Sequence, residues 1–174
     1  MVWYRYLGAD YLTSPDLLVG ALVQYDTMRD SSATLNYMTE GTGWMAGPYL
    51  TARLDDNLFL DARLAWGRSD NRYALATSSG NFETERWLVN ISLTGDFQSG
   101  IWSVQPNLSL SYMEEQQGSF IDSLNVLIAS QTVSRGQVRL GPNFSTRFTG
   151  DNGAVYEPFF TVDAIYSYEN SNSA

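Results

Sequence analysis

The stretch WLVNISLTGD, residues Trp87–Asp96, alternates apolar and polar residues with almost no interruption. Neighbouring side chains of a β-strand point to opposite faces of a sheet, so this period predicts a strand with one apolar and one polar face. The alternation returns along the chain, and one face is free of charge in every segment. We therefore predict an all-β fold of about eight antiparallel strands. The predicted strands are Leu7–Tyr11, Leu17–Tyr25, Trp44–Leu54, Leu58–Trp66, Trp87–Phe97, Trp102–Tyr112, Val138–Phe148 and Tyr156–Tyr166.

Short and long connections alternate between these predicted strands. The short turns are Thr13–Asp16, Asp55–Asn57, Gln98–Gly100 and Gly150–Gly153, and the long connections run near Thr27–Thr42, Arg68–Glu85 and Met113–Val133. Bacterial outer-membrane barrels show this asymmetry, with short periplasmic turns and longer loops outside. The rhythm favours an antiparallel up-and-down transmembrane β-barrel, whose strands of about 9–11 residues cross the membrane at a tilt.

The polar face carries charges of both signs. These candidate lumen-lining residues are Asp10, Asp26, Arg53, Asp61, Arg63, Arg86, Asp96, Arg139, Arg147, Glu157 and Asp163. A catalytic or selectivity cluster is one interpretation. We favour a hydrated lumen in which carboxylates and guanidinium groups neutralise one another across strands. Arg53 and Asp61 flank one short turn and are candidates to face each other.

The orientation of the two faces separates a soluble barrel, with its apolar face inside, from a transmembrane barrel, with its apolar face toward lipid. Aromatic residues near the ends of predicted strands match the interfacial belts of membrane proteins. The predicted belt residues are Trp44, Trp66, Trp87, Trp102 and Tyr112. The predicted strands are also longer than is usual in soluble sandwiches. Both features favour the transmembrane orientation.

Composition excludes several classes of function. The 174 residues suffice for one domain, and they include no cysteine and no histidine. Imidazole-dependent catalysis and thiolate or histidine metal sites are therefore absent, and we expect no enzyme activity, cofactor or metal. The formal charge of −9 has the wrong sign for a nucleic-acid partner. The acidic runs Asp55-Asp56-Asn57 and Glu114-Glu115 have calcium-type oxygen ligands, but turn chemistry explains the first more simply.

Four prolines fall inside the predicted strands, where each removes a hydrogen bond of the ladder. They are Pro48, Pro106, Pro142 and Pro158, and all point to the apolar face. Bulges or loosely paired positions are the simplest interpretation.

Short fragments in a fixed order give the chain a family resemblance. The run Gly43–Leu50 is similar to a signature of the autotransporter β-domain of type V secretion. The other fragments are Gly8–Leu12 with Leu18–Gly20, Ala65–Ser69, Glu83–Trp87 with Leu93–Asp96, Ser130–Ser134, Gly141-Pro142 and Arg147-Phe148. The resemblance implies an outer-membrane anchor of a Gram-negative bacterium that supports secretion and surface display of an N-terminal passenger. It also implies a linker helix in the lumen and insertion by the outer-membrane assembly machinery, which reads a final strand with a terminal aromatic residue.

The chain departs from that pattern at its ends. It finishes in the polar segment Ser167–Ala174, and no linker helix precedes its first strand. We therefore expect residues 1–174 to be a partial domain that lacks about one N-terminal and three C-terminal strands of a barrel of about twelve. The alternatives are a self-closed eight-stranded structural or adhesion barrel, a barrel enzyme, which the missing histidine disfavours, and a soluble lipocalin-like barrel.

Overall fold

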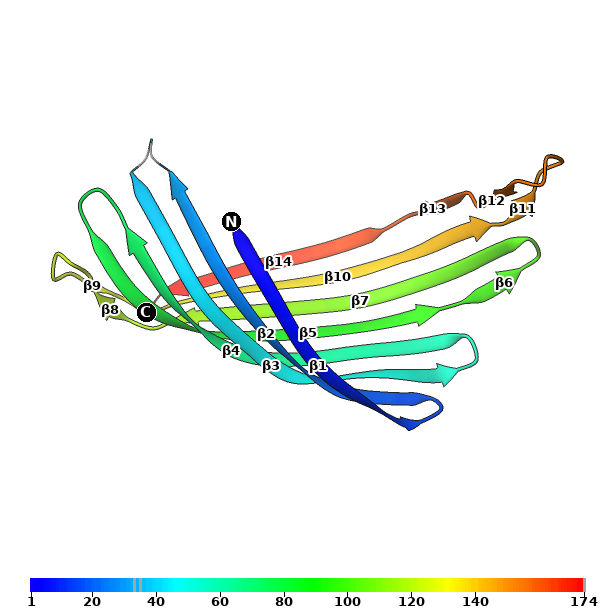
Figure 1. The fold of residues 1–174 in the computed structure, drawn as a ribbon, viewed down its shortest axis with the longest axis horizontal. Helices are drawn as coiled ribbons and strands as arrows, with labels where there is room; N and C mark the ends of the chain where they lie inside the picture. The colour runs from blue at the N-terminus through cyan, green and yellow to red at the C-terminus, as the bar shows by residue number, and fades with distance from the viewer. Residues whose placement is uncertain (33, 35, 174) are drawn as a thin grey trace.

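The structure is a computed structural model that describes residues 1–32, 34 and 36–173. These residues form one long, strongly curved antiparallel sheet (Figure 1). Its main strands are β1 (Val2–Ser14), β2 (Leu17–Ser32), β3 (Tyr37–Asp55), β4 (Leu58–Ala74), β5 (Ser79–Gly95), β7 (Trp102–Gln117), β10 (Gln131–Thr146), β13 (Phe159–Thr161) and β14 (Ala164–Ser173). The short strand β6 (Phe97–Ser99) pairs with β7. Two small hairpins complete the fold, β8 (Phe120–Ile121) with β9 (Leu127–Ile128) and β11 (Phe148–Thr149) with β12 (Val155–Tyr156).

The main strands pair in chain order, as a meander. The order is β1-β2-β3-β4-β5-β7-β10, and β13 and β14 both pair with the far side of β10. The prediction of an all-β, antiparallel, up-and-down arrangement is therefore confirmed. In the part of the chain that the structure describes, no helix has the length and apolar character needed to cross a membrane.

The strand register aligns the apolar faces of all these strands. One row of directly opposed residues runs across the whole sheet, and its members are Tyr11, Val19, Leu50, Ala62, Ile91, Leu110, Val138 and Tyr166. The next row is polar on most strands, with Asp10, Gly20, Tyr49, Arg63, Asn90, Ser111, Gln137 and Ser167. A shift by one residue would exchange the two faces, so the pairing is consistent with the period-two pattern.

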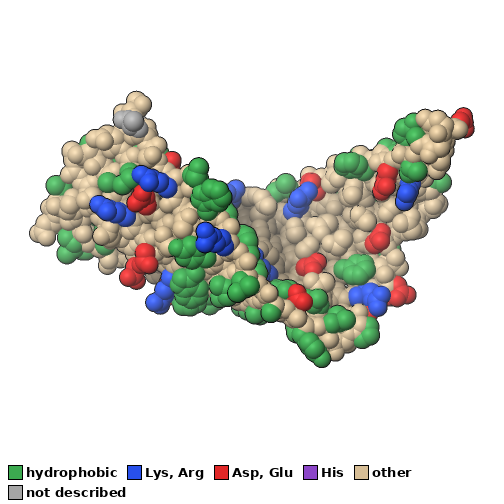
Figure 2. All heavy atoms as spheres, in the orientation of Figure 1, with side chains coloured by type: hydrophobic (Ala, Val, Ile, Leu, Met, Phe, Trp, Pro, Cys, Tyr) green, Lys and Arg blue, Asp and Glu red, His purple; other side chains and the backbone are tan. Residues whose placement is uncertain are grey.

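The polar face is the concave one. Its side chains reach over neighbouring strands, as when the Tyr49 hydroxyl on β3 donates to Asp10 on β1 at 2.7 Å across β2. The apolar face is convex and exposed, and Ile91 in the middle of the sheet keeps 43% of its surface accessible. Figure 2 shows hydrophobic side chains on the visible surface around the bend of the sheet. Only Met45 and Ala65 are buried hydrophobic side chains among the described residues. The distribution of polarity is therefore inverted relative to a soluble protein.

The strands are longer than expected, and most of the predicted long loops are wrong. β3 has 19 residues and β4 has 17. The expected loop Arg68–Glu85 is largely strand, because β4 continues to Ala74 and β5 begins at Ser79. The expected loop Thr27–Thr42 is likewise mostly strand, although Ala33 and Leu35 within it lie outside the described residues. The ladder continues where the apolar face ends, because backbone hydrogen bonds do not depend on side-chain polarity.

Each proline lies where its strand's pairing with one of the two neighbouring strands is interrupted. The pairing of β3 with β4 skips Gly47 and Pro48, between the pairs Ala46–Trp66 and Tyr49–Arg63. The missing proline N–H is therefore not needed there.

Pro106 and Pro142 show the same principle on two adjacent strands. They face each other across β7 and β10. On the other side of Pro106, pairing with β5 ends at Asn107 and pairing with β6 begins at Val104. On the other side of Pro142, pairing with β14 ends at Leu140 and pairing with β13 begins at Asn143. Pro158 directly precedes β13. All four prolines thus mark breaks in pairing.

The two outer strands of the sheet each have one unpaired edge. Within residues 1–32, 34 and 36–173, β1 pairs only with β2, and β13 and β14 pair only with β10. β1 and β14 do not pair with each other in this part of the chain. The self-closed eight-stranded barrel that we considered as an alternative is therefore not the arrangement observed.

Candidate functional site

The concave face is organised around an arginine that spans several strands. Arg86 on β5 forms an ion pair with Asp26 on β2, with Nη2 to Oδ1 at 3.0 Å and Nη1 to Oδ2 at 3.1 Å. Both side chains are largely buried, at 15% and 11% exposure. Two strands lie between them, a separation of about 14 Å on a flat sheet with strands ~4.8 Å apart. The contact therefore requires the sheet to curve toward this face.

A small residue on one of the two intervening strands makes room for the Arg86 side chain. Gly43 on β3 lies beneath it, and a β-carbon there would lie 2.1 Å from Arg86 Nη2. Gly67 on β4, the register partner of Arg86, instead makes room for β3, because a β-carbon there would lie 1.9 Å from the Trp44 carbonyl oxygen. The Ser69 hydroxyl beside Gly43 is 2.7 Å from the Thr84 hydroxyl, and it accepts a hydrogen bond from Asn71 Nδ2 at 2.8 Å. A polar network is thus buried on the concave face, in which Arg86 Nε is the one buried side-chain nitrogen without a hydrogen-bond partner among the described residues.

The short-turn half of this face holds further polar contacts. Thr51 donates its hydroxyl to Asp61 Oδ1 at 2.6 Å. Arg53 donates from Nε to Asp16 Oδ1 at 2.7 Å. The expected Arg53–Asp61 contact is therefore wrong, because the register places Asp61 opposite Thr51 and Arg53 opposite Phe59.

Two ion pairs join β10 to the end of the chain. Arg139 Nη2 lies 2.6 Å from Asp163 Oδ2, and both residues were predicted for this face. Arg135 Nε lies 3.3 Å from Glu169 Oε1. The second pair was missed because Arg135 was placed near the end of a predicted loop and Glu169 in a polar tail. The alternation of tyrosine with polar residues in Tyr166–Glu169 was the available signal, whereas residues 131–137 show no such alternation.

Four predicted residues lie outside the regular strands, namely Asp163, described above, and Asp96, Arg147 and Glu157. Asp96 follows β5 and accepts a hydrogen bond from Gln105 Nε2 at 3.4 Å. Arg147 and Glu157 line one hollow of about 890 Å³ near the short turns. The structure thus brings these two side chains to one cavity, without an ion pair between them among the described contacts.

Arg63 stands apart from the paired charges. It lines a hollow of about 440 Å³ in the middle of the concave face, with Tyr49, Asp61, Asn90 and Ser111 among its neighbours. Its Nε is buried and has no hydrogen-bond partner, and Arg63 forms no ion pair with any residue that the structure describes. A guanidinium with unused donors can bind a carboxylate or a backbone carbonyl in such a hollow.

The predicted aromatic belt lies on the convex face. Trp44, Trp66 and Trp87 come from three adjacent strands, with ring centroids 5.3 Å apart for the first two and 6.4 Å for the last two. Tyr112 stands opposite Val89, two residues from Trp87 along β5, and its hydroxyl donates to Glu114 Oε2 at 2.6 Å. Trp102 lies opposite Thr146, at the short-turn end. The five aromatic residues therefore occupy both ends of the apolar face.

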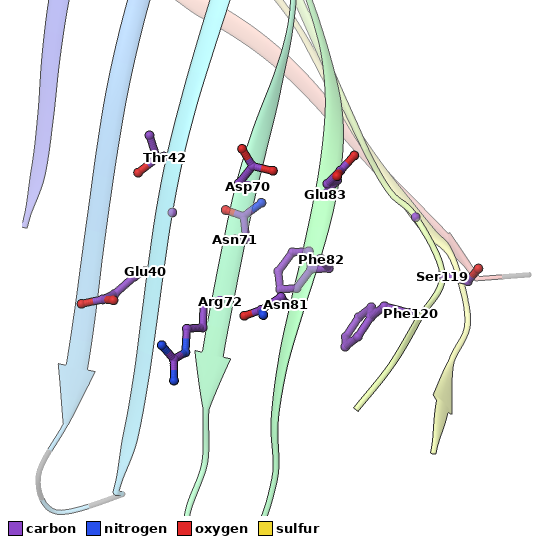
Figure 3. A pocket seen from close by; sticks show the side chains of 12 residues that line it. Glu40, Thr42, Asp70, Asn71, Arg72, Asn81, Phe82, Glu83, Ser119 and Phe120 are labelled. Atoms are coloured by element: carbon purple, nitrogen blue, oxygen red, sulfur yellow. The ribbon is translucent and has the colours of Figure 1, made fainter. Parts of the chain in front are cut away.

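The connection from β7 to β10 folds onto the concave face at the loop end. Phe120 stacks on Phe82 at 5.3 Å and meets Tyr73 edge-on at 5.9 Å, and both partners belong to the polar face of their strands. Figure 3 shows Phe82 and Phe120 facing each other beside a hollow of about 680 Å³ that Asn71 and Glu83 also line. This segment therefore covers part of the polar face of β4 and β5 at that end.

Metal-binding geometry is not found in the described part of the chain, where no group of three or more histidine, cysteine, aspartate or glutamate side chains could hold an ion. The concave face offers hydrogen-bond donors, acceptors and paired charges. Such a surface suits contact with water and with a polar polypeptide.

Comparisons with solved structures identify the fold. The β-domain of the Bordetella autotransporter BrkA superposes with a TM-score of 0.66 at 19% identity, covering 99% of this chain and 85% of that one. The translocator domain of the autotransporter NalP from Neisseria meningitidis gives 0.55 at 11% identity, covering 99% and 74%. BauA, the ferric preacinetobactin receptor from Acinetobacter baumannii, gives 0.61 at 12% identity, covering 99% and 36%. These likenesses show an outer-membrane β-barrel fold.

Sequence comparison supplies the family. No curated protein matches the sequence significantly. The family model described as "Autotransporter beta-domain" matches residues 5–174, which is nearly the whole chain. By this match, the chain belongs to the autotransporter β-domain family.

Proposed function

We propose that the concave face is the lumen wall of a pore and that it holds a segment of the passenger protein as that segment crosses the membrane. The domain itself is an outer-membrane translocator and anchor of a Gram-negative bacterium. The observation that carries the proposal is the inverted polarity of the sheet, with a continuous apolar row outside and the Arg86–Asp26 network inside. In a membrane barrel this arrangement gives a hydrated interior and a lipid-facing exterior.

The unpaired Arg63 is the proposed contact for the lumenal segment, which the family resemblance describes as a linker helix. Its hollow lies midway along the strands, where a helix on the barrel axis would pass. An acidic side chain or a backbone carbonyl of that helix would use the donors that Arg63 leaves free. The domain acts in this proposal without catalysis or cofactor, as expected from a chain with no histidine and no cysteine.

Closure of the pore requires further strands. The free edges of β1 and β14 would leave backbone N–H and C=O groups unpaired in hydrocarbon, which membrane proteins do not tolerate. One strand beside β1 and three beside β14 would complete the barrel of about twelve that the resemblance implies. The outer-membrane assembly machinery and the surrounding lipid are the proposed partners for its insertion.

Photo-crosslinking in the full-length protein tests this assignment. A photoreactive amino acid at Asn90 should crosslink to the passenger-side segment, because Asn90 lies on the concave face beside Arg63. The neighbouring position Ile91 is the matched control, since its side chain lies on the convex face and should react with lipid only. Passenger crosslinks from Ile91, or none from Asn90, would contradict the proposal.

A further inference from the structure

Arginine is distributed unevenly over the convex face. All ten basic residues of the chain are arginines. Four of them lie on the convex face, namely Arg5, Arg29, Arg68 and Arg72, and all four are exposed. We call these residues the arginine collar. The register shows that they share this face, because Arg5 and Arg68 belong to the row of Trp44, and Arg29 and Arg72 both oppose Glu40.

The arginine collar lies at one end of the apolar surface. On the convex face, the row that contains Arg5 and Arg68 lies next to the row that contains Trp66 and Trp87. It is the one farther from the short turns. Between the aromatic row and the short turns, the convex side of the described strands carries no charged side chain. The two ends of the apolar surface therefore differ, because aromatic and aliphatic residues such as Trp102, Leu54 and Phe97 occupy the turn end.

We propose that the arginine collar binds the phosphate groups of phosphorylated lipid headgroups in the leaflet on the loop side of the outer membrane. Guanidinium groups bind phosphate with paired, charge-assisted hydrogen bonds. Their position next to the aromatic row places them at the height where headgroups begin. The inference rests on the proposed orientation of the convex face toward lipid.

The local contacts hold two of these guanidinium groups in place and leave the other two free. Arg68 packs over the Trp66 ring, 5.3 Å from its centroid, and its Nη2 lies 2.8 Å from Glu85 Oε1. Arg29 Nε lies 3.3 Å from Glu40 Oε1. Each guanidinium has five N–H donors, so both retain donors for a phosphate. Arg5 and Arg72 form no ion pair with any of the described residues.

Carboxylates also lie in this region, on Glu40, Asp70, Glu83, Glu85 and Glu114 of the convex face. The surface is therefore of mixed sign and would not attract anions over long distances. Binding depends instead on direct contact between the guanidinium groups and a headgroup whose acyl chains lie against Trp66 and its neighbours. A lipid with a phosphorylated headgroup can contact both the guanidinium groups and the apolar residues, whereas inorganic phosphate can contact only the guanidinium groups.

The test uses the full-length protein, in which the barrel can close, in phosphatidylcholine vesicles that contain either diphosphoryl lipid A or the same lipid A after removal of its phosphates. Flotation measures insertion, and native mass spectrometry measures how much lipid A each chain retains. We expect the wild-type protein to retain at least tenfold more of the diphosphoryl form than of the dephosphorylated form. The variant R68Q/R72Q should lose most of that preference, because it loses charge-assisted hydrogen bonds to phosphate. Excess inorganic phosphate should not displace the lipid.

The matched control is R135Q/R139Q, which removes two exposed arginines from the concave face of β10. It should keep the full preference for the phosphorylated lipid. An equal loss in both variants, no loss in R68Q/R72Q, or displacement by inorganic phosphate would overturn the arginine collar as a lipid site while leaving the pore proposal intact. Failure of the full-length protein to insert into any vesicle would overturn both.

Discussion

Arg86 and Asp26 form a bidentate ion pair across two intervening strands, β3 and β4. Most polar contacts of a sheet join adjacent strands, so they do not depend on how strongly the sheet curves. This pair does depend on curvature, because the two side chains meet only where the concave face brings β2 and β5 together. The ion pair can therefore form only when the sheet has this curvature.

Substitution of Asp26 by Asn should destabilise the domain measurably. The change leaves the largely buried Arg86 guanidinium without its counter-charge, and hydrogen bonds to charged groups contribute about 1.5–3 kcal/mol. The measurement is the free energy of unfolding in lipid vesicles, from urea titration of tryptophan fluorescence. The exposed pair Arg135–Glu169 provides the control, since Glu169→Gln should cost less than about 1 kcal/mol. Equal effects of the two substitutions would show that the long-range pair is unimportant.

Gly43→Ala tests the space beneath Arg86. The new β-carbon would lie 2.1 Å from Arg86 Nη2 and 2.9 Å from Ser69 Cβ, so the arginine must move away from Asp26. Overpacking of this kind costs about 1–3 kcal/mol. Gly118→Ala is the control, because its nearest neighbour would be 3.9 Å away. The same urea titration compares them, and unchanged stability of Gly43→Ala would mean that Arg86 has an equally good alternative position.

Adjacent residues of β5 test which face meets lipid. Ile91→Arg places a charge in the central apolar row, which costs about 2–4 kcal/mol near the bilayer midplane. Asn90→Arg places the same charge on the concave face and should change stability far less. Folding yield into vesicles, read from the heat-dependent mobility of the folded band on a gel, measures the difference. A greater loss for Asn90→Arg would reverse the assignment of the two faces.

The period-two pattern was enough to predict the strand order and the two faces. Residues such as Leu50, Ile91 and Leu110 share one face because each strand keeps its alternation, and consecutive strands of a meander pair with each other. The strand ends could not be predicted in the same way. Segments such as Arg68–Ala74 lose their apolar face beyond the aromatic row, yet they keep the backbone ladder.

Contacts within the concave face were harder to predict than the face itself. The Arg53–Asp61 contact failed because the register places Asp61 opposite Thr51, to which it is hydrogen-bonded, while Arg53 reaches Asp16 instead. The Arg86–Asp26 pair joins strands that are not neighbours, and strand pairing rules identify only adjacent partners. The curvature that makes this pair possible is a property of the whole sheet.

The tip of the β2–β3 hairpin should respond to alkaline pH. The Tyr37 hydroxyl donates to Asp30 Oδ2 at 2.7 Å, and this hydrogen bond raises the pKa of Tyr37 above its ordinary value of 10.0. Stability from the neutral tyrosine is then fully present below pH 10.0 and is lost as the pH rises through the raised pKa. The ultraviolet difference titration between the wild-type chain and Tyr37→Phe isolates this group. Ionisation of Tyr37 at or below the ordinary value would contradict the structure.

The positions of the prolines suggest a test of how strongly the domain depends on continuous hydrogen bonding between its strands. Leu108 is paired on both sides, with Leu93 on β5 and Leu140 on β10, so Leu108→Pro must remove a hydrogen bond from a continuous ladder. A proline inside a regular element costs about 3 kcal/mol or more. Pro106→Ala, two residues away, should be nearly neutral, because the ladder toward β5 and β6 is already interrupted there. Folding yield into vesicles compares the two variants. If Pro106→Ala lowered the folding yield as much as Leu108→Pro, Pro106 would itself stabilise the bend of the sheet. It would then not be merely tolerated where pairing is interrupted.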